Sequence, residues 1–338
     1  MREPPNDLPL SALRDALATD YGLSAGAIEF LPVGHDAYAW AFRATARDGA
    51  RYFVKVRRRI TNEAGLVIPH FLRERGVARV VAPLATLRGT LWGTAADYAL
   101  VVYPFLDGAT GMAAGLSERQ WVEYGATLRQ IHDTVPSAQV AARLRRDDFV
   151  PDGAATVRAL DEHVGTGAFD DSVRSLIAAF WRANRSPIRT VLDRAQELGL
   201  RLAASAPPLV LCHADIHTNN VLREADDHVW IVDWDETMLA PRERDLMFVI
   251  GGIGPGFVSA RQEALFLDGY GSVDIDPVAL AFYRYAWATS DIGAYGDQVF
   301  LREDLGELDR REAVERFQSL FAPGSIVDIA LGSETGPR

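Results

Sequence analysis

One short segment of the chain holds residue types that together could catalyse phosphoryl transfer. It runs from His213 to Asn220, with Asp215 and Asn220 separated by four residues, and a later apolar run ends at Asp233. If two neighbouring strands bring Asp215, Asn220 and Asp233 together, they form a carboxylate base beside an oxygen-rich Mg²⁺ site. Phosphoryl transfer needs that set, because the phosphates require a hard cation and the acceptor hydroxyl requires a proton acceptor. A polar surface hairpin is the alternative, and the length of the pattern argues against it.

A lone lysine supplies a second indication. Lys55 lies within Tyr52-Phe-Val-Lys-Val56, and it is the single lysine among 35 basic residues. A compact ammonium in mid-strand suits the binding of nucleotide phosphates, where a planar guanidinium would not fit. Glu63, on the following helix, is the natural ion-pair partner, because Glu74 lies near the end of that helix. A strand lysine that reaches for solvent is the alternative.

The elements that must position these residues fall into two groups. In the first 105 residues, apolar periodicity and turn residues predict a small sheet that carries one or two helices. The strands are expected at 28–40, 50–56 and 98–105, and the helices at 11–20 and 61–75, the second stopped by Gly76.

Beyond residue 105 the pattern is mainly helical. Ser117 and Gln120 predict a capping box, and further amphipathic helices are expected at 172–181 and 187–202. One β-rich stretch interrupts them, with strands expected at 209–212, 220–222 and 229–232, a turn at 225–227, and helices again up to about residue 321. Most strands precede most helices, which is the order of an α+β fold rather than of alternating βαβ units.

Composition excludes several classes of function. The formal net charge of −11 disfavours a nucleic-acid partner. It is compatible with a cationic ligand, although solubility alone would explain it. The N-terminus lacks the apolar stretch of a secretory signal, and no apolar run approaches the roughly 18 residues of a membrane span. With Cys212 as the single cysteine, no intrachain disulfide can form, and we expect a cytoplasmic protein.

The stretches His213–Leu222 and Ile231–Phe248 resemble the aminoglycoside phosphotransferase and choline kinase superfamily, which shares the protein-kinase fold. Members that phosphorylate spectinomycin are similar almost residue by residue, and the similarity extends over nearly the whole chain. It continues at 121–132, 270–275 and 290–292. The resemblance implies a bilobal α+β fold, with a β-rich nucleotide-binding N-lobe at 1–105 and a larger helical C-lobe at 106–338. The C-lobe would carry the catalytic loop and the acceptor site.

The resemblance also implies a role for each matching position. Asp215 would be the catalytic base or orient the acceptor hydroxyl, and Asn220 and Asp233 would hold Mg²⁺. Lys55, paired with Glu63, would bind the phosphates. His213 would brace the catalytic loop, and Asp245 would anchor it in a structural role. Contact with adenine would fall to Tyr103, Pro104 and Phe105. Acceptor binding is a weaker expectation for Asp235, Glu236 and Asp291, for each of which a structural or solvated role competes.

Two features of the N-lobe depart from the simplest kinase pattern. The first loop, 33–40, has one glycine where protein kinases have three, which predicts a less snug cover over the phosphates. The run Arg57-Arg58-Arg59 could reach phosphates, but a solvated strand end is the preferred interpretation.

The expected reaction is ATP- and Mg²⁺-dependent O-phosphorylation of a cationic aminocyclitol antibiotic, with spectinomycin as the first candidate. A kinase of the same fold acting on another amino alcohol, sugar or antibiotic is the main alternative. A pseudokinase used as a binding module is the second, and the intact Lys55, Asp215, Asn220 and Asp233 argue against it. The sequence leaves open whether the protein is a monomer or a homodimer and whether it prefers ATP or GTP. It also leaves open whether its role is resistance or the self-protection of a producing organism.

Overall fold

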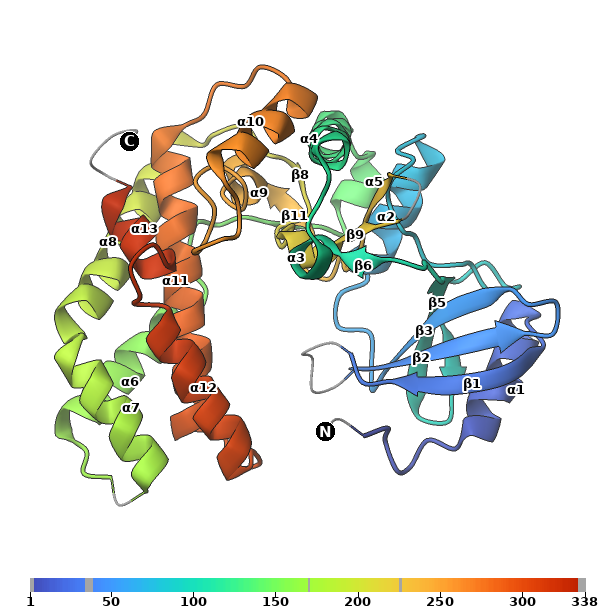
Figure 1. Ribbon diagram of the computed structural model, residues 1–338, viewed down its shortest axis with the longest axis horizontal. Coiled ribbons are helices and arrows are strands. Elements are labelled where there is room, and N and C mark those ends of the chain that lie inside the picture. Colours follow the sequence, from blue (N-terminus) through green and yellow to red (C-terminus); the bar gives the residue numbers. More distant parts are fainter. Residues whose placement is uncertain (1–2, 34–38, 170, 225–226, 334–338) are drawn as a thin grey trace. The chain divides into compact units, whose positions relative to one another are not determined.

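The computed structural model describes residues 3–33, 39–169, 171–224 and 227–333. Their packing groups the chain into two compact units (Figure 1). The first consists of residues 1–145 and 213–238, and the second of 146–212 and 239–338. This grouping differs from the division expected near residue 105, because residues 106–145 and 213–238 pack with the N-terminal residues. The assignment of nucleotide and acceptor binding to separate lobes stays a prediction.

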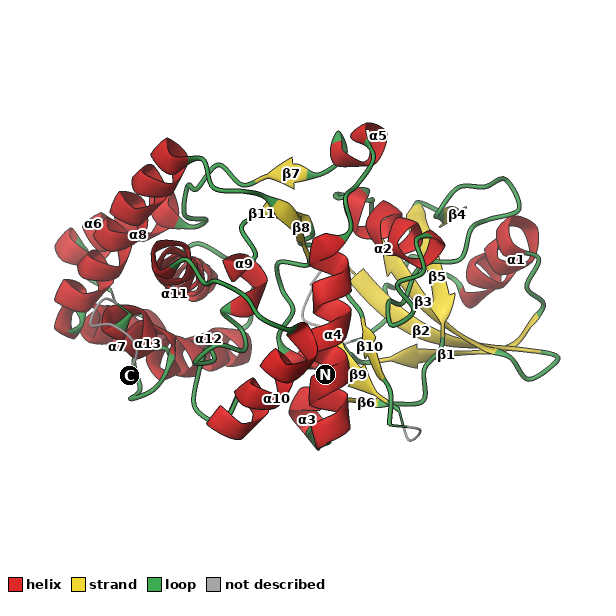
Figure 2. Cartoon of the chain, turned by 90° about the horizontal axis from the view of Figure 1, so that it is seen from above, coloured by secondary structure: helices red, strands yellow, loops and turns green. Residues whose placement is uncertain are grey.

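The first unit is built on a five-stranded antiparallel sheet with α1 (Leu10–Tyr21) beside it (Figure 2). The strand order is β1-β2-β3-β5-β4, formed by Ala25–Leu31, Ala39–Ala46, Arg51–Arg57, Tyr98–Pro104 and Gly93–Ala95. Buried apolar side chains of the helix and the sheet form one core, which includes Leu13, Leu17, Phe42, Val54, Val56 and Leu100. The single strand expected at 28–40 is wrong, because β1 ends at Leu31 and β2 begins at Ala39.

The same unit contains the β-rich stretch that carries the expected catalytic residues. Its small sheet has the order β10-β9-β6, formed by Val229–Ile231, Val221–Arg223 and Ala109–Thr110. The helical elements are α2 (Ala64–Glu74), α3 (Gly111–Ala114), α4 (Glu118–Asp133), α5 (Ala138–Ala141) and the 3₁₀ turn η1 (Thr218–Asn220). The predicted capping box is confirmed at the start of α4, where Ser117 and Gln120 each bond the other's backbone N–H.

The second unit is mainly helical. Its helices are α6 (Ala154–Thr166), α7 (Ser172–Ala183), α8 (Arg185–Ser205), α9 (Glu243–Leu246), α10 (Ala260–Tyr270), α11 (Pro277–Phe300), α12 (Glu307–Ser319) and α13 (Ile326–Gly332). The long α11 lies along α8 and α12, and the Trp181 ring stacks on Phe317 with centroids 5.4 Å apart. A short sheet forms near residues 145, 212 and 239, where the chain passes from one unit to the other. Its strands, in order, are β7 (Arg145–Arg146), β11 (Met238–Ala240) and β8 (Val210–Cys212).

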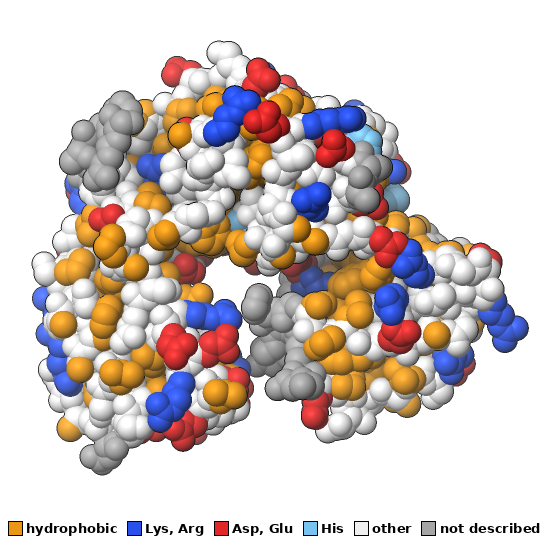
Figure 3. Space-filling view, viewed as in Figure 1, with side chains coloured by type: hydrophobic (Ala, Val, Ile, Leu, Met, Phe, Trp, Pro, Cys, Tyr) orange, Lys and Arg blue, Asp and Glu red, His pale blue; other side chains and the backbone are white. Residues whose placement is uncertain are grey.

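These elements confirm the α+β class, with an antiparallel sheet in the N-terminal region and a helical C-terminal part. Among the described residues, no helix is long and apolar enough to cross a membrane. On the face shown in Figure 3, acidic and basic side chains are interspersed on each unit.

Candidate active site

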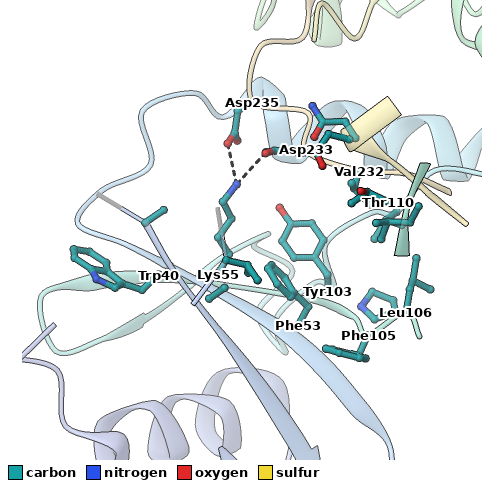
Figure 4. Close-up of a pocket in the computed structure, with 18 of the residues that line it drawn as sticks. Trp40, Phe53, Lys55, Tyr103, Phe105, Leu106, Thr110, Val232, Asp233 and Asp235 are labelled. Atoms are coloured by element: carbon teal, nitrogen blue, oxygen red, sulfur yellow. Dashed lines mark hydrogen bonds and ion pairs between the residues drawn. The ribbon is translucent and has the colours of Figure 1, made fainter. Parts of the chain in front are cut away.

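A cavity of about 640 Å³ opens within the first unit, between the five-stranded sheet and the β9–β10 region. One part of its wall is apolar and the other is charged (Figure 4). The apolar wall includes Trp40, Phe53, Val81, Tyr103, Phe105, Leu222 and Val232, and the charged wall includes Lys55, Arg57, Asp233 and Asp235. Its volume lies within the range of about 300–1,000 Å³ that is usual for small-molecule and cofactor sites.

Strand alternation on β3 brings two cations to this cavity. Val54 and Val56 point into the core, so Lys55 and Arg57 share the opposite face. Lys55 Nζ lies 3.0 Å from Asp233 Oδ1 and 2.9 Å from Asp235 Oδ2. The strand therefore delivers an ammonium to the point where β10 has just ended.

The two carboxylates around Lys55 differ in their protonation behaviour. Burial raises the pKa of Asp235, but the charges of Lys55 and Arg57 outweigh it and lower that pKa to about 2. For Asp233 the pKa is raised, because desolvation by the surrounding protein atoms outweighs the opposing charge of Lys55 even though 47% of the side chain is exposed. Asp235 is therefore the firmly ionised partner of the two cations.

His213 ties the loop of Asp215 to the end of β10. Its Nε2 donates to Val232 O at 2.9 Å, and its Nδ1 accepts the backbone N–H of Asp215 at 3.3 Å. These bonds assign a neutral ring with the proton on Nε2. The ring is fully buried and packs against Trp234 with centroids 4.7 Å apart. His213 therefore links the backbone at Asp215 to the backbone at Val232, and its bracing role stays a prediction.

Backbone strain marks both ends of this connection. Ala214 has a φ of 69° and Asp233 a φ of 61°, in the left-handed region that non-glycine residues seldom adopt. Such residues cluster at functional sites, where the surrounding structure holds them in place. The strain therefore agrees with a site in which the direction of the Asp215 and Asp233 side chains matters.

Both carboxylate oxygens of Asp215 have a partner. Asn220 Nδ2 donates to Asp215 Oδ2 at 3.0 Å and to its backbone oxygen at 2.7 Å. His217 Nε2 lies 3.3 Å from Asp215 Oδ1, and Tyr124 donates from its hydroxyl to the neighbouring Ile216 oxygen. The carboxylate is thus held in one orientation beside the cavity wall that contains Asn220.

The residues proposed for Mg²⁺ fit a hard cation. Both bonds from Asn220 to Asp215 use the amide nitrogen, so the amide oxygen Oδ1 is the atom that could act as a ligand. Asp233 supplies a carboxylate whose side chain is 47% exposed. Amide and carboxylate oxygens are the ligands that Mg²⁺ prefers.

The structure corrects the expected ion pair between Lys55 and Glu63. Glu63 is the residue just before the first turn of α2, and its carboxylate accepts a bond from Arg143 Nη1 at 2.7 Å. Lys55 instead contacts Asp233 and Asp235. Asp235, for which the sequence suggested acceptor binding, therefore lies beside Lys55 on the charged wall of the cavity.

The other predicted residues are placed as follows. Tyr103, Pro104 and Phe105 line the cavity, which is compatible with their expected contact with adenine. Glu236 is exposed in the first unit, whereas the second unit contains Asp245, fully buried in α9, and Asp291, part-buried on α11. The roles expected for these three residues stay predictions. Residues 34–38 of the first loop and 225–226 of the predicted turn lie outside the described residues.

Three contributors to the site were missed in the sequence. Arg57, expected to be solvated, has a side chain only 11% exposed and pairs with Asp235. Asn62 donates to Asp235 O at 2.6 Å and also accepts the N–H of Ala64 at the start of α2. Gly65 allows that helix to approach, because a Cβ there would lie 3.0 Å from Trp234 O. The spacing of Lys55 and Arg57, two apart on a strand, was an available signal.

Comparisons with known proteins agree with this geometry. Residues 27–283 match the family described as "Phosphotransferase enzyme family". The crystal structure of a spectinomycin phosphotransferase with ADP and spectinomycin is similar at 30% identity, covers 98% of this chain and 100% of that chain, and has a TM-score of 0.89. Its AMP-bound complex has 30% identity, coverage of 96% and 98%, and a TM-score of 0.82. Protein StrN of Streptomyces griseus is 26% identical over 313 residues, which are 90% of this chain and 88% of StrN.

Proposed function

Because the chain belongs to the phosphotransferase enzyme family, we propose that it transfers the γ-phosphoryl group of ATP to a hydroxyl of spectinomycin or a closely related aminocyclitol. The family and the kinase-like fold make it a small-molecule phosphotransferase. The proposal depends most on one observation. Lys55, Asn220 and Asp233 line one cavity of the first unit, and Asn220 holds the Asp215 carboxylate.

ATP fits the two-sided character of the cavity. The apolar wall around Phe53, Tyr103 and Phe105 suits a purine ring, and Lys55 on the charged wall suits its phosphates. Support for a nucleotide comes from the similar enzyme, whose crystal structures contain ADP and AMP. Adenine and phosphate binding would thus occupy opposite walls of one cavity.

We assign Asn220 Oδ1 and Asp233 as the protein ligands of Mg²⁺. The ion would neutralise phosphate charge during transfer. The chain's own groups do the rest: Lys55 binds the phosphates and Asp215 holds the acceptor hydroxyl. Asn220 and His217 fix the carboxylate of Asp215, so one of its oxygens can accept the hydroxyl proton in a defined direction.

The acceptor is proposed from the similarity over 98% of the chain to an enzyme crystallised with spectinomycin. The net charge of −11 is compatible with a dicationic substrate. An ion pair about 4 Å apart at a semi-exposed site contributes up to about 4 kcal/mol before desolvation costs. In this proposal the enzyme acts in the cytoplasm, where ATP is available, and its action protects the cell from the drug.

The test is incubation with ATP, Mg²⁺ and either spectinomycin or kanamycin, read by mass spectrometry for one added phosphate. We expect phosphorylated spectinomycin and unchanged kanamycin, with the Asp215→Asn variant as a control of much lower activity. Turnover of some other hydroxyl compound, with none of spectinomycin, would replace the acceptor and keep the chemistry. Nucleotide binding with no transfer to any acceptor would instead indicate a binding module.

A further inference from the structure

One carboxylate in the cavity is shared by two cations of the same strand. Asp235 Oδ2 accepts from Lys55 Nζ at 2.9 Å and also from Arg57 Nη2 (Figure 4 draws the bond from Lys55). We call these three residues the β3 triad. All three line the cavity, with side chains that are 19%, 11% and 29% exposed for Lys55, Arg57 and Asp235. These side chains are therefore held against the cavity wall rather than extended into solvent.

The start of α2 fixes the backbone of Asp235. Asn62 donates to its carbonyl oxygen at 2.6 Å, and Gly65 comes so close that a Cβ would lie 3.2 Å from the Asp235 Cα. Glu63, the acidic residue next to these two, points to Arg143 instead. In this chain the helix therefore supports Lys55 through residue 235, not through a glutamate of its own.

Charge balance gives Arg57 a role. Before Mg²⁺ binds to Asp233, Lys55 faces two carboxylates, Asp233 and Asp235, so these three groups alone carry a net charge of about −1 when all are ionised. Without the metal, such a cluster would repel nucleotide phosphates. Arg57 brings the balance to zero, and a guanidinium has five N–H donors, enough to bind a carboxylate and a phosphate oxygen together.

We propose that Asp235 is a positioning residue that holds Lys55 and Arg57 side by side, and that Arg57 binds the nucleotide phosphates together with Lys55. The proposal rests on the nucleotide site proposed above and is independent of which acceptor is used. It removes Asp235 from the acceptor pocket. An acceptor-binding Asp235 would control the KM of the cationic substrate, whereas a positioning Asp235 controls kcat/KM for ATP.

The first experiment measures binding without catalysis. Calorimetric titration of ADP, with and without Mg²⁺, compares the wild type with Arg57→Gln, Arg57→Lys and the control Arg59→Gln, which alters an exposed arginine of the same run. Loss of one charge-assisted phosphate contact should weaken ADP binding about tenfold in Arg57→Gln. Arg57→Lys should recover part of that loss. ADP binding by Arg57→Gln at wild-type affinity would overturn the role of Arg57.

The second experiment is a double-mutant cycle on kcat/KM for ATP. Asp235→Asn and Arg57→Gln should each lower it about tenfold, and the double variant should be little worse than the poorer single variant, because both act on one unit. Losses that multiply to about 100-fold would contradict the triad. An Asp235→Asn protein with a raised acceptor KM and an unchanged kcat/KM for ATP would return Asp235 to the acceptor pocket.

Two further comparisons keep these outcomes interpretable. Asp235→Glu preserves the charge and should retain more activity than Asp235→Asn, and thermal unfolding of each variant identifies any that fail to fold. If the wild type binds ADP but phosphorylates no aminocyclitol, the proposed acceptor is wrong. The ADP titrations of the Arg57 variants still decide the present proposal in that case.

Discussion

Asn220 holds Asp215 by two bonds from one amide nitrogen, at 2.7 Å to the backbone oxygen and 3.0 Å to Oδ2. The residue proposed as a Mg²⁺ ligand thus also orients the residue proposed to bind the acceptor hydroxyl. The amide nitrogen serves Asp215 and the amide oxygen remains the metal-binding atom. Loss of Asn220 is therefore expected to affect both functions, whereas loss of Asp215 should affect one.

Asp215→Asn should bind Mg²⁺-ADP nearly as the wild type does, and its turnover should be slower by roughly 10²-fold or more. The reason is that the partners of the Asp215 carboxylate are Asn220 and His217, and general-base groups typically contribute about 10²–10⁴-fold. Calorimetry for ADP and steady-state rates with spectinomycin are the measurements. A large loss of nucleotide affinity would contradict the separation of roles.

Asp233→Asn should show the opposite behaviour. Removal of a charged metal ligand weakens Mg²⁺-ADP binding, while ADP binding in the absence of Mg²⁺ should be weakened less, because Lys55 keeps its contact with Asp235. The comparison of the two titrations isolates the metal contribution. Equal losses with and without Mg²⁺ would assign Asp233 to Lys55 rather than to the metal.

Cys212 should be unreactive in the folded protein. The side chain is fully buried, and burial raises the pKa of its thiol well above the usual value. Ellman's reagent should therefore label no thiol in the native state at about pH 7 to 9, and one per chain in guanidinium. Because the folded pKa exceeds the unfolded one, this group's contribution to stability is complete below the unfolded pKa and is lost as pH rises from the unfolded pKa through the folded pKa. Rapid native labelling would contradict the packing around β8.

The proximity of the residues proposed as catalytic could be predicted from the sequence because its signals are local. The interval from Asp215 to Asn220 and the apolar run before Asp233 each lie within a few residues of a strand. Alternation with the apolar Val54 and Val56 placed the Lys55 side chain on the face of β3 opposite the core. For Asp215 and Asn220 the spacing along the chain already indicated that the two side chains could meet.

The partners of Lys55 could not be predicted in the same way. They depend on where α2 begins relative to the strand end at Asp233, which is a tertiary relationship. Glu63 is close to Lys55 in sequence but lies just before the first helical turn, and Arg143 pairs with it there. Asp235 is 180 residues away in sequence and reaches Lys55 because Asn62 and Gly65 bring the helix against its backbone.

Gly65→Ala tests that close approach. Alanine is the better helix former by about 1 kcal/mol. Its Cβ, however, would lie 3.0 Å from Trp234 O and 3.2 Å from the Asp235 Cα, so the backbone must move. We expect a net loss of about 1–2 kcal/mol in the free energy of unfolding, together with a lower kcat/KM for ATP. Chemical denaturation and steady-state kinetics measure the two effects. Increased stability with unchanged kinetics would show that the contact is not needed.

Lys55→Arg keeps the positive charge but replaces a compact ammonium with a planar guanidinium. The ammonium lies between Asp233 and Asp235 at 3.0 and 2.9 Å, and Arg57 already occupies the same oxygen of Asp235. A second planar guanidinium cannot share that oxygen in the same geometry, although the net charge is unchanged. The variant should fold, with a melting temperature near that of the wild type, and kcat should fall roughly 10²-fold, the scale for loss of an electrostatic stabiliser. Thermal unfolding and initial rates at saturating ATP are the measurements. Near-wild-type turnover would mean that the nucleotide phosphates bind elsewhere.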